Sequence, residues 1–260
     1  MTDRPCASDV CVVMPVFNEE TTVAGVLDAV RVYFDGGVVV VDDGSTDATA
    51  GIVSGRSDVT LLRHDANRGY GASLASGFAR ALEVGAGVVV TMDCDGQHEP
   101  RHIPEFCAEM ASRGADVVSG SRYLPGSAVV GRAPADRQDV NRRIAAIVNG
   151  LTGWSLTDAF CGFKAYRAEA LRRAPVDEPE YAVPMQFWAR AWRAGLTVCE
   201  MPVERIYSDS DRSFGADLDD PERRFAYYVR VWERTLAEDR AAVAGAEVPA
   251  VTARGGVDRG

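Results

Sequence analysis

The sequence VVVTMDCDGQ at residues 88–97 joins an apolar run directly to a cluster of acids. Its continuously apolar part, residues 88–92, is typical of a strand that is buried on both faces of a parallel sheet. In the extended turn that follows, alternate residues can direct Asp93, Asp95 and the Gln97 amide at one point. Hard divalent cations prefer oxygen ligands, so these three residues are candidate ligands for Mg²⁺ or Mn²⁺. Paired acids are also common in solvated loops and helix caps, and it is the position at a strand end that favours the metal site.

Apolar runs of the same kind recur through the first half of the chain, separated by helix-like segments. The expected strands cover residues 10–14, 38–41, 59–62, 88–92 and 115–119, and the expected helices cover residues 19–34, 47–54, 71–84 and 101–112. Strands that alternate with helices predict an α/β fold, with a Rossmann-like, mostly parallel sheet flanked by helices. Further helices are expected at residues 137–151, 167–173, 183–194 and 223–236, with a short strand or turn at 158–164 and a strand at 197–203.

The composition indicates one large domain without a membrane span. The 260 residues are 47% hydrophobic, which is enough for a substantial core. A formal net charge of −10 argues against nucleic-acid binding, because surfaces that bind polyanions are basic. No apolar run approaches the roughly 18 to 20 residues that span a bilayer, and no hydrophobic signal core begins the chain. We expect a domain at residues 10–238, an N-terminal tail at 1–9 and a disordered tail at 239–260.

Polar and acidic residues follow the expected strands, at the edge where parallel sheets collect ligands. Asp42 and Asp43 close the second strand, and their paired negative charge is unfavourable unless a ligand's base or ribose donates hydrogen bonds to one of them. Residues 45–47 (STD) then form an N-cap cluster, and the glycines of NRGYGAS at 67–73 allow a tight turn and close backbone approach. Residues 15–19 (PVFNE) replace the Gly-rich phosphate loop of a dinucleotide-binding fold, which disfavours an NAD-dependent enzyme.

Five motifs in this order and spacing resemble those of family 2 glycosyltransferases. They are VMPVFNEE at 13–20, VDDGSTD at 41–47, NRGYG at 67–71, DCDGQ at 93–97 and GSR at 120–122. DAFCGFK at 158–164, followed by Arg167, resembles the dolichyl-phosphate mannose synthase and polyprenyl-phosphate glycosyltransferase branch. The resemblance covers residues 11 to about 203. It implies a GT-A fold and a metal-dependent, inverting transfer of a hexose from a GDP- or UDP-sugar.

The resemblance also implies roles for individual residues, with a donor-binding half at 10–122 and an acceptor half at 123–238 that includes the C-terminal helix. The donor residues are Pro15, Val16, Asn18 and Glu19 at the nucleoside, Asp42 at the base or ribose, Asp43 and Arg68 nearby, and Asp93, Cys94, Asp95 and Gln97 at the diphosphate and metal. Arg122 would face the transferring phosphate or the acceptor.

The acceptor remains open at this point. A polyprenyl phosphate is already anionic and needs positioning by cations, for which Arg122, Arg142, Arg143 and Lys164 are the candidates. Arg142 and Arg143 could equally form a solvated helix face. A sugar or alcohol hydroxyl would instead need a general base, for which Asp158 is the candidate, although Asp158 could equally anchor the turn at Gly162.

Two departures from that branch bear on the lipid acceptor. The usual Arg-x-x-Gly-x-Ser-Lys ending is replaced by YSDSDRSFG at 207–215, and no membrane helices follow it. Six scattered cysteines without a Cys-x-x-Cys pair fit a reducing cytoplasm, so we expect a cytoplasmic protein whose contact with a membrane face is at most peripheral. A nucleotidyltransferase and a non-catalytic nucleotide-sugar binding module are the alternative functions.

Two further features have competing interpretations. His98 and His102 lie four residues apart, but a third zinc ligand is not evident, so we expect histidines on a helix surface. The helix at 223–236 carries an aromatic stripe on one face, made of Phe225, Tyr228, Val229, Trp232 and Leu236. This stripe either docks against the sheet or approaches a bilayer.

Overall fold

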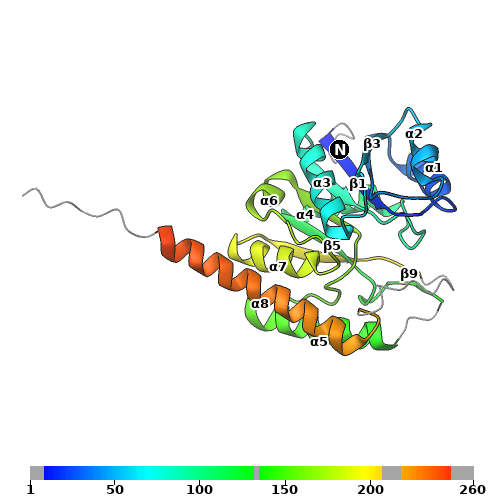
Figure 1. Cartoon of the computed structure of the whole chain (residues 1–260). Coiled ribbons are helices and arrows are strands. Elements are labelled where there is room, and N and C mark those ends of the chain that lie inside the picture. Colours follow the sequence, from blue (N-terminus) through cyan, green and yellow to red (C-terminus); the bar gives the residue numbers. More distant parts are fainter. Residues whose placement is uncertain (1–8, 132–134, 207–217, 247–260) are drawn as a thin grey trace, which may run out of the picture.

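The computed structural model describes residues 9–131, 135–206 and 218–246. A seven-stranded sheet of order β3-β2-β1-β4-β7-β5-β8 runs through it (Figure 1). Its strands are β1 (Val10–Val16), β2 (Gly37–Asp42), β3 (Thr60–Arg63), β4 (Val88–Thr91), β5 (Val117–Ser121), β7 (Lys164–Arg167) and β8 (Val198–Pro202). A separate pair is formed by β6 (Val129–Val130) and β9 (Arg205–Ile206).

The sheet is mostly parallel, as the alternation of strands and helices predicted. β1 pairs in parallel with β2 and β4, and β5 pairs in parallel with β8. β7 is the exception, because it lies antiparallel between β4 and β5. The expected strand or turn at 158–164 is therefore a loop that ends in β7, and this loop crosses the carboxyl edge of the sheet.

Helices cover both faces of the sheet. They are α1 (Val23–Tyr33), α2 (Thr49–Ser54), α3 (Tyr70–Glu83), α4 (His102–Arg113), α5 (Ala135–Thr152), α6 (Ala168–Arg173), α7 (Val183–Arg193) and α8 (Pro221–Ala246). Because side chains alternate along a strand, Val12 and Met14 of β1 join a core with Leu27 of α1. Val13 joins the opposite core with Phe78 of α3. This double burial explains the unbroken apolar runs.

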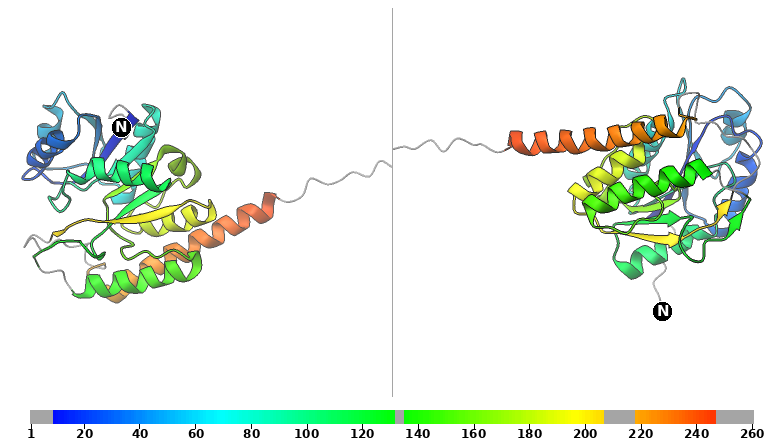
Figure 2. Two further views of the ribbon diagram at one scale, coloured as in Figure 1. Left: turned by 180° about the vertical axis from the view of Figure 1, so that it is seen from behind. Right: turned by 90° about the horizontal axis from the view of Figure 1, so that it is seen from below.

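The C-terminal helix α8 packs on α5 and α7 (Figure 2). Its buried residues Tyr228, Val231 and Trp232 belong to the same core as α3 and α7, so the aromatic stripe docks on neighbouring helices. The helix continues to Ala246, beyond the expected boundary at Glu238. Residues 247–260 and the unusual segment 207–215 lie outside the described residues. Within the described residues, no helix is long and apolar enough to cross a membrane.

Candidate active site

A cleft of about 810 Å³ opens at the carboxyl ends of β1 and β4. The strand order reverses here, because β1 lies between β2 and β4, and open α/β sheets bind ligands at such a point. The cleft is lined on one side by residues that follow β1, β2 and β4, including Pro15, Val16, Asn18, Glu19, Asp43, Asp93, Cys94, Asp95 and Gln97. Its other side is lined by residues that follow β5 or come later in the chain, including Arg122, Tyr123, Arg137, Asn141, Phe160, Arg224 and Tyr228.

The loops after β1 and β2 hold each other in place. Asn18 has a positive φ of 55°. Its side-chain oxygen Oδ1 accepts a hydrogen bond from the backbone amide of Thr46 at 2.9 Å, and its backbone amide donates one to Ser45 Oγ at 2.9 Å. The Glu19 amide donates to Thr49 Oγ1 at 2.8 Å. Ser45 therefore fixes the neighbouring loop, whereas the sequence suggested that it caps the next helix.

Asp42 and Asp43 have separate protein partners, which is how the fold tolerates two adjacent acids. The fully buried Asp42 accepts the Ser45 amide at 3.0 Å and pairs with Arg63 Nε at 3.1 Å, outside the cleft. Asp43 lines the cleft and accepts the Arg68 and Gly69 amides, both at 2.9 Å. Arg68 thus contributes its backbone here, and its side chain is exposed outside the cleft.

The glycines after β3 allow close packing of the chain on itself. A Cβ atom on Gly71 would collide with the Glu178 carbonyl oxygen, and one on Gly69, whose φ is +101°, would collide with the Pro179 carbonyl oxygen. The Ala72 amide donates to that same Pro179 oxygen at 3.0 Å. These glycines seat the segment before α7 over the start of α3.

Asp93, Asp95 and Gln97 all line the cleft, at the end of β4. Tyr70 donates its hydroxyl to Asp93 Oδ1 at 2.8 Å, and the Gln97 amide donates to Asp95 Oδ1 at 2.9 Å. A Cβ on Gly162 would collide with Asp93 Oδ2, so this glycine leaves room for the carboxylate. Burial and the nearby charge of Asp93 raise the pKa of Tyr70 well above its ordinary value, so Tyr70 stays a hydrogen-bond donor.

This donor set fits a divalent metal, because two carboxylates and an amide are hard oxygen ligands. Among the described residues there is no group of three or more His, Cys, Asp and Glu that could hold an ion unaided. A shared site, in which the donor's phosphate oxygens and water complete the coordination, is how Mg²⁺ is usually bound.

His98 and His102 are buried, which corrects the expectation of surface histidines. His98 Nδ1 accepts the Asp93 amide at 3.0 Å, and its ring stacks on Phe163 at 5.0 Å. His102 is paired with Glu105 and, at 2.6 Å, with Glu204. His98 thus supports the backbone of Asp93, a role that the spacing of the histidines does not reveal.

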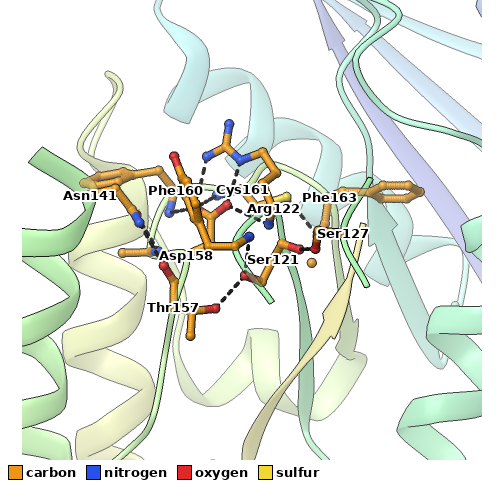
Figure 3. A network of polar contacts seen from close by, with 12 residues as sticks. Ser121, Arg122, Ser127, Asn141, Thr157, Asp158, Phe160, Cys161 and Phe163 are labelled. Carbon is orange, nitrogen blue, oxygen red and sulfur yellow. Dashed lines mark hydrogen bonds and ion pairs between the residues drawn. The ribbon is translucent and has the colours of Figure 1, made fainter. Parts of the chain in front are cut away.

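Arg122 lines the cleft. Its side chain is held by two contacts with the carboxylate of Asp158 (Figure 3). Asp158 Oδ2 accepts Arg122 Nε at 2.6 Å and Oδ1 accepts Nη2 at 3.0 Å, and the amides of Phe160 and Cys161 also donate to Oδ1. Burial alone raises the pKa of Asp158, but the charge and hydrogen bonds of Arg122 outweigh it, so the pKa lies below its ordinary value. Because Asp158 is 0% exposed, its contacts are those of an anchor for Arg122 and for the turn at Gly162.

The other three expected acceptor residues lie outside the cleft. Lys164 is buried beneath it, where Nζ donates to the Cys161 carbonyl oxygen and lies 5.5 Å from the Trp188 ring. Burial lowers the pKa of Lys164. Arg142 is exposed and paired with Asp139. Arg143 joins α5 to α8, with Nη1 2.6 Å from Glu222 Oε1.

Arg137 and Arg224 line the cleft instead, and neither was predicted from the sequence. Arg224 is 3% exposed, donates Nη1 to the Leu218 carbonyl oxygen at 2.8 Å and pairs with Asp136 at 2.7 Å. Asp136 directly precedes Arg137 in the first turn of α5. A signal for Arg224 was present, because it lies one helical turn before Tyr228 and so shares the face on which α8 docks.

Residues 11–174 match the family model described as Glycosyl transferase family 2. The chain belongs to this family. The undecaprenyl-phosphate mannosyltransferase of Micrococcus luteus is 33% identical in an alignment of 220 positions that covers 79% of this chain and 88% of that protein. The polyprenol monophosphomannose synthase of Mycolicibacterium smegmatis is 29% identical over 205 residues, covering 74% and 75% of the two chains.

The fold has a counterpart of known structure. Glucosyl-3-phosphoglycerate synthase from Mycobacterium tuberculosis, in complex with Mn²⁺, UDP-glucose and phosphoglyceric acid, superposes with a TM-score of 0.69 at 21% identity, over 88% of this chain and 80% of that one. The sheet flanked by helices is therefore a GT-A fold, and the enzyme is a glycosyltransferase, as the five motifs predicted. Family membership also disfavours the nucleotidyltransferase and the non-catalytic binding module.

Proposed function

We propose that this glycosyltransferase moves a hexose from a GDP- or UDP-sugar to a polyprenyl phosphate. The observation that carries the acceptor assignment is that Arg122, Arg137 and Arg224 line the same cleft as Asp93 and Asp95. The acids follow β4, and we call their part of the lining the acidic side; the arginines come from the end of β5, from α5 and from α8, and we call their part the arginine side. Guanidinium groups bind phosphate with matched geometry. The names of the relatives from Micrococcus luteus and Mycolicibacterium smegmatis agree with such an acceptor.

The donor diphosphate would lie at Asp93, Asp95 and Gln97, where a shared Mg²⁺ or Mn²⁺ would supply Lewis-acid stabilisation of the leaving group. Tyr70 orients Asp93 through its hydroxyl, and the loops after β1 and β2 would hold the nucleoside beside Asp43. Because Asp43 already accepts two backbone amides, it would be rigid when the nucleoside arrives.

The acceptor phosphate would lie against the arginine side of the cleft. An oxygen of this phosphate attacks the anomeric carbon, the bond from that carbon to the nucleoside diphosphate breaks, and the departing diphosphate keeps the electron pair. No proton has to be removed, because the phosphate oxygen is already anionic. Arg122, fixed by Asp158, orients this oxygen without losing entropy at the moment of reaction.

A hydroxyl acceptor fits the site less well. It needs a base in the cleft, and the candidate from the sequence, Asp158, is fully buried and has a lowered pKa. A group with these properties is a weak proton acceptor near neutral pH. The polyprenyl phosphate would be reached at the cytoplasmic face of a membrane, with the enzyme bound peripherally.

Two experiments test the proposal. A thermal-shift panel of GDP-, UDP- and dTDP-sugars with Mn²⁺ should reveal one donor that raises the Tm, since a ligand of the folded state stabilises it. The enzyme should then transfer radiolabelled sugar from this donor to a polyprenyl phosphate and leave the matched polyprenol, which lacks the phosphate, unmodified. Equal transfer to the polyprenol would refute the phosphate acceptor, and a pyrophosphate-releasing reaction with a nucleoside triphosphate would refute the glycosyl transfer.

A further inference from the structure

Ser73 and Glu180 both line the cleft, and neither side chain has a hydrogen-bond partner among the described residues. The Ser73 hydroxyl in the first half of α3 is 0% exposed, and burying such a group without a bond is unfavourable. Three residues earlier, Tyr70 of the same helix donates its hydroxyl to Asp93. Ser73 is therefore a buried hydroxyl close to the residues that would hold the donor diphosphate.

Glu180 belongs to the segment between α6 and α7 that lies over the start of α3. A Cβ on Gly69 would be 3.0 Å from Glu180 Oε1, so the carboxylate lies directly over the Gly69 turn. The next residue, Tyr181, stacks on Tyr70 with ring centroids 5.8 Å apart. The segment thus places Glu180 and Ser73 around the same Gly69–Tyr70 turn.

The acids near Glu180 already have partners. Asp43 accepts the Arg68 and Gly69 amides, and Glu178 accepts the Tyr227 hydroxyl at 2.7 Å and pairs with Arg234 at 2.6 Å. In the described part of the chain, no cation or hydrogen-bond donor is paired with the Glu180 carboxylate. It therefore offers acceptor oxygens to a ligand in the cleft.

The charge at this corner decides what kind of ligand fits. Glu180, Asp43 and Glu178 would repel a phosphate, which the arginine side of the cleft suits better. An uncharged polyol fits, because its hydroxyls can donate to the Glu180 carboxylate and accept from the Ser73 hydroxyl. The hexose of the donor is such a group, and it is joined directly to the diphosphate that would lie at Asp93.

We infer that Ser73 and Glu180 bind hydroxyl groups of the donor's hexose and select which hexose is used. This inference rests on the proposed function, because it requires a nucleotide-sugar donor. A site built to bond a substrate hydroxyl rejects an analogue without that hydroxyl, since the polar groups of the site are then left unpaired.

The test compares two ligands, the nucleoside diphosphate and the matching nucleotide-sugar, by calorimetry with Mn²⁺. Glu180→Gln and Ser73→Ala should each weaken the nucleotide-sugar by about 10-fold, the loss of one good hydrogen bond, and leave the nucleoside diphosphate unchanged. Glu83→Gln is the matched control, because Glu83 lies at the other end of α3 from Ser73, where it is exposed and pairs with Arg80. An equal loss for both ligands, or no loss for either, would overturn the inference.

Two further measurements separate the possible failures. Ser73→Ala should keep or raise the Tm of the ligand-free protein, because its hydroxyl has no partner there; a lower Tm would reveal a structural bond and count against the inference. If the wild type bound no nucleotide-sugar at all, the proposed function itself would fail. If the wild type bound the donor and Glu180→Gln bound it equally well, only the hexose assignment would fail.

Discussion

Replacing Asp158 with asparagine should destabilise the protein strongly, because an amide cannot hold Arg122 as a carboxylate does. The substitution removes a fully buried charge that bonds both Nε and Nη2 of Arg122, at 2.6 and 3.0 Å. The asparagine also places an NH₂ group, which is a donor, against Arg122 and the amides of Phe160 and Cys161, which are donors too. Breaking a buried pair costs about 3–5 kcal/mol, and because the Arg122 side chain is 21% exposed we take the lower end of this range.

About 3 kcal/mol corresponds to a fall in Tm of roughly 6–12 °C for a domain of this size. Differential scanning calorimetry at pH 7 measures it, and Asp139→Asn is the matched control, because Asp139 pairs with Arg142 in solvent. The control should melt close to the wild type. If the Tm of Asp158→Asn equalled that of Asp139→Asn, the view that Asp158 anchors the site would be refuted.

The pH dependence of the same two proteins gives a second check. The folded protein holds the pKa of Asp158 below its ordinary value of 3.8, so the unfolded chain binds the proton more readily. The stabilisation is therefore present above pH 3.8 and is lost as the pH falls through the folded pKa. The difference in Tm between wild type and Asp158→Asn should narrow in acid, and a difference that grows in acid would contradict the assigned pKa direction.

Three further predictions concern the donor, the acceptor and the buried thiols. Asp95→Ala should lose roughly two to three orders of magnitude in turnover with an unchanged Tm, and wild-type turnover that survives saturating EDTA would exclude the metal. Arg137→Ala should raise the KM for the acceptor by about 10-fold, the loss of a charged hydrogen bond, whereas Arg142→Ala should not; the opposite ranking in steady-state kinetics would refute the acceptor site. Burial raises the pKa of Cys11 and Cys107 to about 11, so mass-mapped alkylation at pH 8 should label neither until urea unfolds the protein, and labelling in the folded protein would contradict their burial.

The donor side of the cleft was predictable because its residues follow directly from strands that the sequence makes evident. Continuous valine runs predict β1, β2 and β4, and the carboxyl ends of neighbouring parallel strands must meet at one edge. The sequence alone therefore predicts that Asp93, Asp95 and Gln97 lie close to Pro15–Glu19. The exception is Asp42, whose partner Arg63 depends on the pairing of β2 with β3.

The acceptor side was less predictable because it depends on how helices are rotated and docked. Arg137 and Arg142 lie on the same helix, but five positions turn the side chain by about 140° around its axis, so only one can face the cleft. Arg122 and Asp158 are 36 positions apart, and their pairing follows from the loop that leads into β7. Arg224 enters the cleft only because α8 docks on α5 and α7.

The antiparallel strand β7 has a consequence for how such an enzyme can diverge. It separates β3, β2, β1 and β4, whose loops form the acidic side of the cleft, from β5 and β8, and Arg122 follows β5. β7 bonds to β4 and β5 through its backbone, which any residue except proline can supply. Mutations on the β5 side can therefore accumulate without disturbing the pairing of β1 with β2 and β4. A lineage could exchange its acceptor over evolutionary time and inherit its donor chemistry intact.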